Sequence, residues 1–74
     1  MKVGDKVMYQ NRSFTVSEMY LNNIFKNLKY SSTEEINEDD YRTVMVLLTS
    51  NVEEPKKVHL PELWKPLMLV PNPK

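Results

Sequence analysis

The chain has 74 residues, of which 41% are hydrophobic and 27% charged, and its ten basic and ten acidic side chains give a formal net charge of zero. This length predicts a single domain, residues 1–74, whose small core leaves little room for the deep cleft of a typical catalytic site. Cysteine is absent, which excludes disulfides and thiolate metal sites and favours a cytoplasmic location for so small a domain. No signal peptide is expected, and the longest apolar run, residues 44–48, is too short to span a membrane.

Charge is unevenly distributed along the chain. Residues 1–30 carry five basic and two acidic side chains (net +3), residues 31–54 carry one and seven (net −6), and residues 55–74 carry four and one (net +3). A folded molecule with opposite poles is therefore expected, which bears on steering and association. A dedicated nucleic-acid-binding protein would more often be strongly basic overall.

The chain begins with a predicted β-hairpin. Residues 3–10 form the first strand, residues 11–13 the turn, where Asn tolerates positive φ and Ser bonds locally to the backbone, and residues 14–17 a second strand rich in β-forming residues. Side chains at even spacing share one face of a strand, so the expected core face carries Val3, Val7, Tyr9, Phe14 and Val16.

The hydrophobic period then changes. Four apolar residues at i, i+3, i+4 and i+7 predict a short amphipathic helix whose stripe packs on the core; they are Leu21, Ile24, Phe25 and Leu28. The alternative is that the second strand continues to about residue 21 and a long loop follows, although a loop of about twenty residues is unusual in a compact domain. The same stripe could instead form a dimer or partner surface.

The segment 31–40 is polar and acidic. Ser32 and Glu35 have the spacing of a capping box, which predicts one helical turn. The alternative is that residues 22–40 are mobile.

The rest of the chain is predicted to be β-rich. Residues 43–49 contain a continuous apolar run and are partly β-branched, which indicates a strand covered on both faces, and residues 57–60 form a further strand. Prolines at both ends of 61–66 fit a single 3₁₀ turn. Residues 67–70 form a fifth short strand, and residues 71–74 a frayed tail.

This succession resembles the SH3-like small barrels of the Tudor and KOW families. The resemblance rests on Val-Gly-Asp-Lys-Val at residues 3–7 and on the strand-to-3₁₀ junction at residues 57–63. It implies a mainly β fold, an SH3-like five-stranded barrel with a helical or long-loop insertion between the second and third strands; an α+β domain is the alternative. The second glycine of KOW domains and a recognisable Tudor aromatic cage are missing. The Asn- and Lys-rich, glycine-poor composition is similar to that of small phage-encoded accessory proteins.

Two sets of residues are candidates for binding. Five carboxylates within seven residues could dock on a basic partner, and Trp64, which lies between two prolines, could be an aromatic anchor. The full set is Glu34, Glu35, Glu38, Asp39, Asp40, Trp64 and Tyr30. Basic residues interleaved with tyrosines could bind nucleic acid, because single strands bind basic grooves with stacking platforms; this set is Lys2, Lys6, Arg12, Lys26, Lys29, Tyr9 and Tyr20.

Catalytic, metal and cofactor sites are not expected. His59 is the only histidine, and Gly4 is the only glycine, so neither a multi-histidine site nor a phosphate-binding glycine loop is present in the sequence. We expect a small non-catalytic binding protein that docks on and modulates a protein partner through the acidic insertion, residues 19–42. The alternatives are an RNA- or DNA-binding barrel and a structural homo-oligomer subunit.

Overall fold

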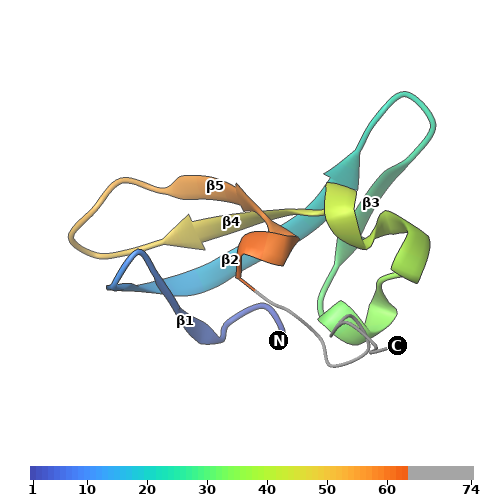
Figure 1. The fold of residues 1–74 in the computed structure, drawn as a ribbon. Coiled ribbons are helices and arrows are strands. Elements are labelled where there is room, and N and C mark those ends of the chain that lie inside the picture. Colours follow the sequence, from blue (N-terminus) through green and yellow to red (C-terminus); the bar gives the residue numbers. More distant parts are fainter. Residues whose placement is uncertain (64–74) are drawn as a thin grey trace, which may run out of the picture.

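The computed structural model describes residues 1–63, and the expected strand 67–70, the tail 71–74 and Trp64 lie outside this range. The described chain is mainly β, with five antiparallel strands and three 3₁₀ turns. The strands are β1 (Lys6–Tyr9), β2 (Arg12–Asn22), β3 (Asn27–Tyr30), β4 (Met45–Thr49) and β5 (Lys56–His59). The turns are η1 (Thr33–Glu35), η2 (Glu38–Thr43) and η3 (Leu60–Glu62) (Figure 1).

Strand β2 is the centre of the sheet. The strands of the sheet follow the order β1-β2-β4-β5. Strand β3 pairs with the C-terminal part of β2, at the end away from β1. The mainly β prediction is confirmed. The strands expected at 3–10 and 43–49 are present with shorter bounds, and the strand expected at 57–60 is displaced by one residue. Within residues 1–63 no strand pairing joins β1 to β5, so the expected barrel is not closed by this part of the chain.

The first hairpin turns one residue earlier than predicted. Gln10 and Asn11 are its two loop residues, with φ of 53° and 67°, between the paired residues Tyr9 and Arg12. Positive φ at both positions is typical of the two-residue turn whose twist matches that of the flanking strands. Gly4, at φ 100°, makes the other left-handed bend, and its N–H donates to the carbonyl of Val16 at 2.8 Å.

The helix predicted around residues 21–28 is wrong. Strand β2 continues to Asn22, the chain turns, and β3 returns antiparallel to it in the register Met19↔Tyr30 to Asn22↔Asn27 (Figure 1). The alternative of a continued strand is confirmed for β2, but a hairpin takes the place of the long loop. The acidic segment that follows forms η1 and η2, so the helical turn predicted from Ser32 and Glu35 is confirmed as η1.

A β-bulge explains how β2 keeps one face buried along its whole length. Its register with β4 shifts between Val16 and Glu18, which leaves Ser17 as the extra residue. Before the bulge Phe14 is buried, and after it Met19 is buried, so the buried positions change from even to odd.

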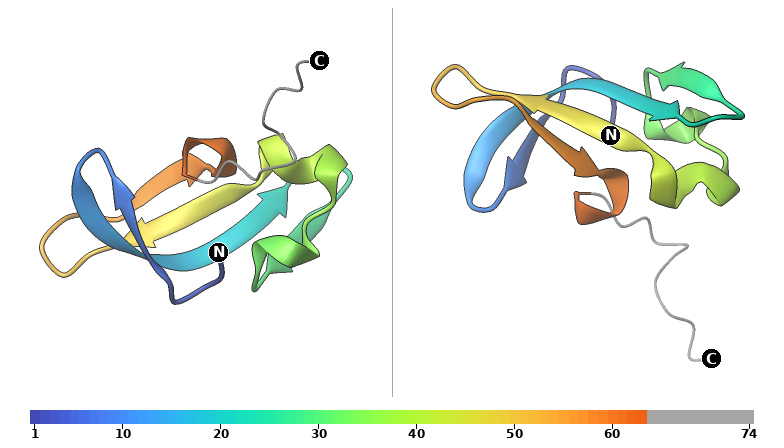
Figure 2. Two further views of the ribbon diagram at one scale, coloured as in Figure 1. Left: turned by 60° about the horizontal axis from the view of Figure 1, so that its bottom comes forward. Right: turned by 90° about the horizontal axis from the view of Figure 1, so that it is seen from above.

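The core lies on one side of the sheet, and η2 and η3 lie on that side (Figure 2). Strand β4 buries alternate residues instead of both faces, so the prediction of two covered faces is wrong for the described chain. The buried apolar residues are Phe14, Val16, Met19, Leu21, Tyr30, Tyr41, Val44, Val46, Leu48, Val58 and Leu60. Of the predicted core face of the first hairpin, Val3 is exposed, and Val7 and Tyr9 only pack at the edge of this cluster.

Candidate functional site

The loop between β2 and β3, which we call the hairpin tip, consists of residues 23–26. It is closed by the Asn23 N–H, which donates to the Lys26 carbonyl at 2.8 Å. The Asn23 side-chain oxygen accepts from the N–H groups of Phe25 (2.7 Å) and Lys26 (2.8 Å). Three hydrogen bonds thus define the backbone of a four-residue loop.

Two large apolar side chains extend from this tip into solvent. Ile24 is 89% exposed and Phe25 is 86% exposed. The expectation that they pack on the core is wrong, because both belong to the loop of the β2–β3 hairpin, and this loop projects from one end of the molecule (Figure 1). Leu21, at the base of the same hairpin, is buried, and Leu28 is 43% exposed. The apolar stripe is therefore divided among a buried Leu21, a partly exposed Leu28 and an exposed tip.

An ion pair connects the hairpin tip to η2. The Lys26 ammonium lies 2.9 and 3.1 Å from the two carboxylate oxygens of Asp40. Its hydrogen bond to Asp40 raises the pKa of Lys26, so this side chain stays charged well above neutral pH. The first turn of η2 is capped by the Asn37 side chain, which accepts from the Asp39 N–H at 3.0 Å. The tip and the acidic start of η2 therefore form one continuous surface.

The five predicted carboxylates have different roles. Glu35 accepts from the Ser31 N–H (3.0 Å) and hydroxyl (2.8 Å), which lowers the pKa of its carboxyl group. Asp40 is paired with Lys26. The other three are exposed and form no ion pair or side-chain hydrogen bond within the described chain, and they are Glu34, Glu38 and Asp39.

Tyr30 does not belong to this surface. Its ring is part of the core, and burial raises the pKa of its hydroxyl, which has no hydrogen-bond partner among residues 1–63. Trp64 lies outside the described residues, so the predicted aromatic anchor is not placed.

The predicted nucleic-acid set does not converge on one site. Arg12 is paired with Glu53 at 2.8 Å, and Lys26 is paired with Asp40. Tyr9 packs edge-on against the core residue Phe14 and donates its hydroxyl to Glu62 at 3.3 Å. Lys2 belongs to the N-terminal segment, where its backbone forms an isolated antiparallel β-bridge with Ser32. The remaining members, Lys6, Lys29 and Tyr20, lie on the sheet face opposite the core.

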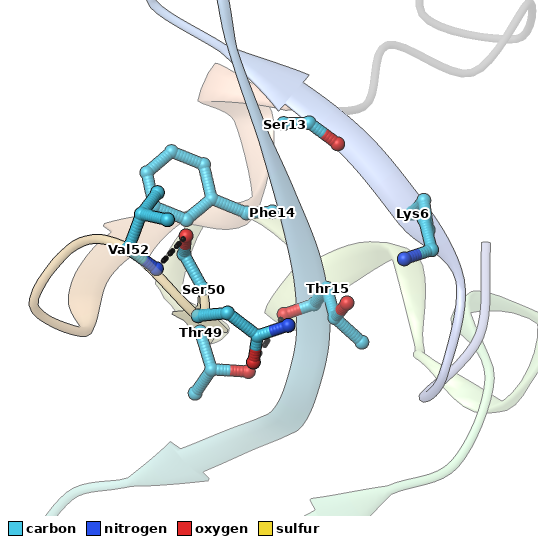
Figure 3. A pocket seen from close by; sticks show the side chains of 8 residues that line it. Lys6, Ser13, Phe14, Thr15, Thr49, Ser50 and Val52 are labelled. Atoms are coloured by element: carbon cyan, nitrogen blue, oxygen red, sulfur yellow. Dashed lines mark hydrogen bonds between the residues drawn. The ribbon is translucent and has the colours of Figure 1, made fainter.

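A small pocket of about 250 Å³ opens where the β1–β2 hairpin separates from the β4–β5 loop (Figure 3). Half of the residues that line it bear a hydroxyl group, and the Ser50 hydroxyl accepts from the Val52 N–H at 3.1 Å. It is lined by Lys6, Ser13, Phe14, Thr15, Thr49, Ser50, Asn51 and Val52.

Sequence reasoning missed the hairpin tip, although signals for it were present. Asparagines at 22, 23 and 27 favour a turn over a helix, and the change from even to odd apolar positions between Val16 and Met19 is the pattern that a bulge produces.

Residues 1–63 contain no cluster of three or more His, Asp or Glu side chains that could hold a metal ion. They also contain no helix long and apolar enough to cross a lipid bilayer. No family model, curated protein or solved structure matches the chain.

Proposed function

We propose that this chain is a non-catalytic binding protein that docks on a protein partner through the hairpin tip and the adjacent acidic residues of η2. The observation that carries the proposal is the pair Ile24 and Phe25, both nearly nine-tenths exposed on a loop closed by three hydrogen bonds. Contiguous exposed apolar side chains commonly mark interaction sites, and aromatic residues are enriched among binding hot spots.

The closed loop favours binding because little conformational freedom remains to be lost on association. The Asn23 hydrogen bonds fix the backbone, and the Lys26–Asp40 pair holds the tip against η2. Two large side chains on such a loop suit a complementary apolar pocket.

The negative charge beside the tip indicates which charge the partner should carry around its binding pocket. Glu38 and Asp39 belong to the same 3₁₀ turn as Asp40 and are exposed, whereas Lys26 is already neutralised. A pocket rimmed by Lys or Arg would complement these carboxylates and accelerate association. An anionic membrane surface would be repelled by them.

The test uses tagged protein and two matched variants. Ile24→Ser/Phe25→Ser should lose the partner captured by wild type at an unchanged melting temperature, while Val52→Ser, which also alters an 86% exposed side chain, should keep it. Glu38→Lys/Asp39→Lys should slow association. If the tip variant retains the same partner as wild type, the proposal is wrong. If the tip docks on a second copy of the chain, sedimentation will depend on protein concentration and on Phe25.

We also infer an SH3-like barrel for the complete chain. The outer edge of β1 pairs with no strand within residues 1–63, and the Tyr9–Glu62 hydrogen bond brings the end of η3 beside β1. The strand expected at 67–70 would supply the closing pairing. Nuclear Overhauser contacts between backbone protons of 67–70 and β1 would support this arrangement, and contacts to another strand would contradict it.

A further inference from the structure

The sheet face opposite the core, which we call the outer face, is a second surface with its own chemistry. Strand alternation and the pairing register place Tyr20 beside Met45, and Glu18 beside Leu47, in neighbouring strands. Tyr20, Met45 and Leu47 are all partly exposed, and they form an apolar band across β2 and β4. This band is separate from the hairpin tip.

The band is bordered by basic side chains from three other strands. Lys29 pairs with Tyr20 in the β2–β3 register, Lys57 pairs with Leu47 in the β4–β5 register, and Lys6 pairs with Thr15 in the β1–β2 register. Glu18 is the one carboxylate on this face within the described strands, and it lies 4.0 Å from the Lys29 ammonium. The face is therefore positively charged, with the Tyr20 ring between Lys29 on β3 and Met45 on β4.

The hydroxyl-lined pocket adjoins one end of the band. Thr15 and Thr49 face each other in the register and belong to both the outer face and the pocket wall, and Lys6 supplies the cation. The Thr49 hydroxyl donates to the Thr15 carbonyl at 3.5 Å, and the other hydroxyls of the wall belong to Ser13, Thr15 and Ser50. Hydroxyl donors around an ammonium group suit an oxygen-rich anion such as a phosphate. From Thr49 to Met45 the outer face extends for roughly 13 Å, at about 3.3 Å per strand residue.

We propose that the outer face binds a short single-stranded nucleic acid. One phosphate would occupy the pocket beside Lys6. Further phosphates would be neutralised by Lys57 and Lys29, and a base would stack on Tyr20. Base stacking on an aromatic platform requires unpaired bases, so a single strand is favoured over a duplex. A second copy of this chain is disfavoured as the occupant, since pairing the face with itself would bring like charges together.

The test is fluorescence anisotropy with labelled ten-nucleotide single strands of DNA and of RNA of one sequence, the corresponding duplex, and poly-glutamate as an anion without bases. Wild type should bind a single strand more tightly than the duplex or poly-glutamate. Its affinity should fall with salt, because counterions are released. Absence of single-strand binding at low salt, or equal affinity for poly-glutamate, would overturn the proposal.

Neighbouring lysines on β5 provide the matched control. Lys57 points to the outer face, whereas Lys56 alternates to the other face. Lys57→Gln should reduce the slope of log affinity against log salt by about 0.7, the value for one phosphate contact with a single strand. Lys56→Gln should leave the slope unchanged. Equal effects of the two substitutions would contradict a site on this face.

Two further substitutions separate stacking from charge. Tyr20→Leu should weaken binding by roughly tenfold or more without changing the salt slope, and Tyr20→Phe should retain wild-type affinity, because stacking needs only the ring. Glu18→Gln removes the carboxylate on this face and should tighten binding. A Tyr20→Leu variant that folds and binds like wild type would rule out the stacking platform.

Discussion

The two hairpin loops at opposite ends of the molecule, residues 23–26 and 50–55, differ in what they expose (Figure 1). Phe25 and Val52 are equally exposed, at 86%. Phe25 is next to Ile24, however, on a loop closed by hydrogen bonds and joined to an acidic turn, whereas Val52 is a single small side chain. Its loop is fixed by the Arg12–Glu53 pair. Exposure alone therefore does not define a binding site; the size and adjacency of its apolar side chains, and the acidic turn beside them, distinguish the first loop from the second.

The hairpin tip is positioned by the buried residues of β2, Met19 and Leu21. Of the changes considered, deleting Ser17 should have the largest effect on stability, because it should expose both of them. Without the bulge residue, Met19 and Leu21 would turn toward solvent and Glu18 toward the core. Each buried apolar side chain contributes about 1.5–3 kcal/mol, so the loss approaches the whole stability of a small domain, about 5 kcal/mol. Circular dichroism should show an unfolded chain. A cooperative thermal transition like that of wild type would contradict the bulge assignment.

The division of the apolar stripe into base and tip predicts a smaller but distinct effect. Leu21→Ala should lower the free energy of unfolding by about 2–5 kcal/mol, since this side chain is only 1% exposed. Ile24→Ala should change it by less than about 0.5 kcal/mol, as expected for a surface position. Urea denaturation measures both. Similar losses for the two variants would indicate that residues 21–28 form a packed helix instead.

Asn23→Ala tests whether the tip is fixed by its side chain. The substitution removes two hydrogen bonds to backbone N–H groups and should destabilise the protein by about 1 kcal/mol. The matched change in the other loop, Ser50→Ala, removes one such bond and should have a smaller effect. Hydrogen exchange at the Phe25 and Lys26 amides should accelerate only in the Asn23 variant. Unchanged exchange there would show that the loop is not closed by Asn23.

The smallest effect concerns acid sensitivity near η1. Because the folded pKa of Glu35 lies below its ordinary value of 4.5, its ionised form stabilises the fold above that pH. This contribution is lost as pH falls through the lowered pKa. Glu35→Gln should therefore be slightly less stable than wild type at neutral pH and equal to it in acid. A constant difference at all pH values would show that the Ser31 hydrogen bonds do not depend on the charge.

Much of the sheet was predictable because strand alternation is a local property. The first hairpin and β5 follow from period-2 patterns, β4 from a continuous run of apolar and β-branched residues, and η1 from its capping residues. The segment after residue 18 was not predictable from the sequence. The bulge at Ser17 moves the buried positions of β2 from even to odd numbers, and the exposed Ile24 and Phe25 complete an apolar spacing that imitates a helix. Nothing in local spacing shows that Lys26 pairs with Asp40, fourteen residues away, or that Tyr20 and Lys57 share a sheet face.

The central claim is that the hairpin tip, and not exposure in general, is the docking element. Replacing Phe25 or Val52 with the photo-crosslinking residue benzoylphenylalanine in the full chain tests this in an extract of the cells that express it. We predict one discrete adduct from position 25 that excess wild type suppresses and excess Ile24→Ser/Phe25→Ser does not, and no such adduct from position 52. Absence of an adduct at 25, or the same adduct from both positions, would contradict the claim.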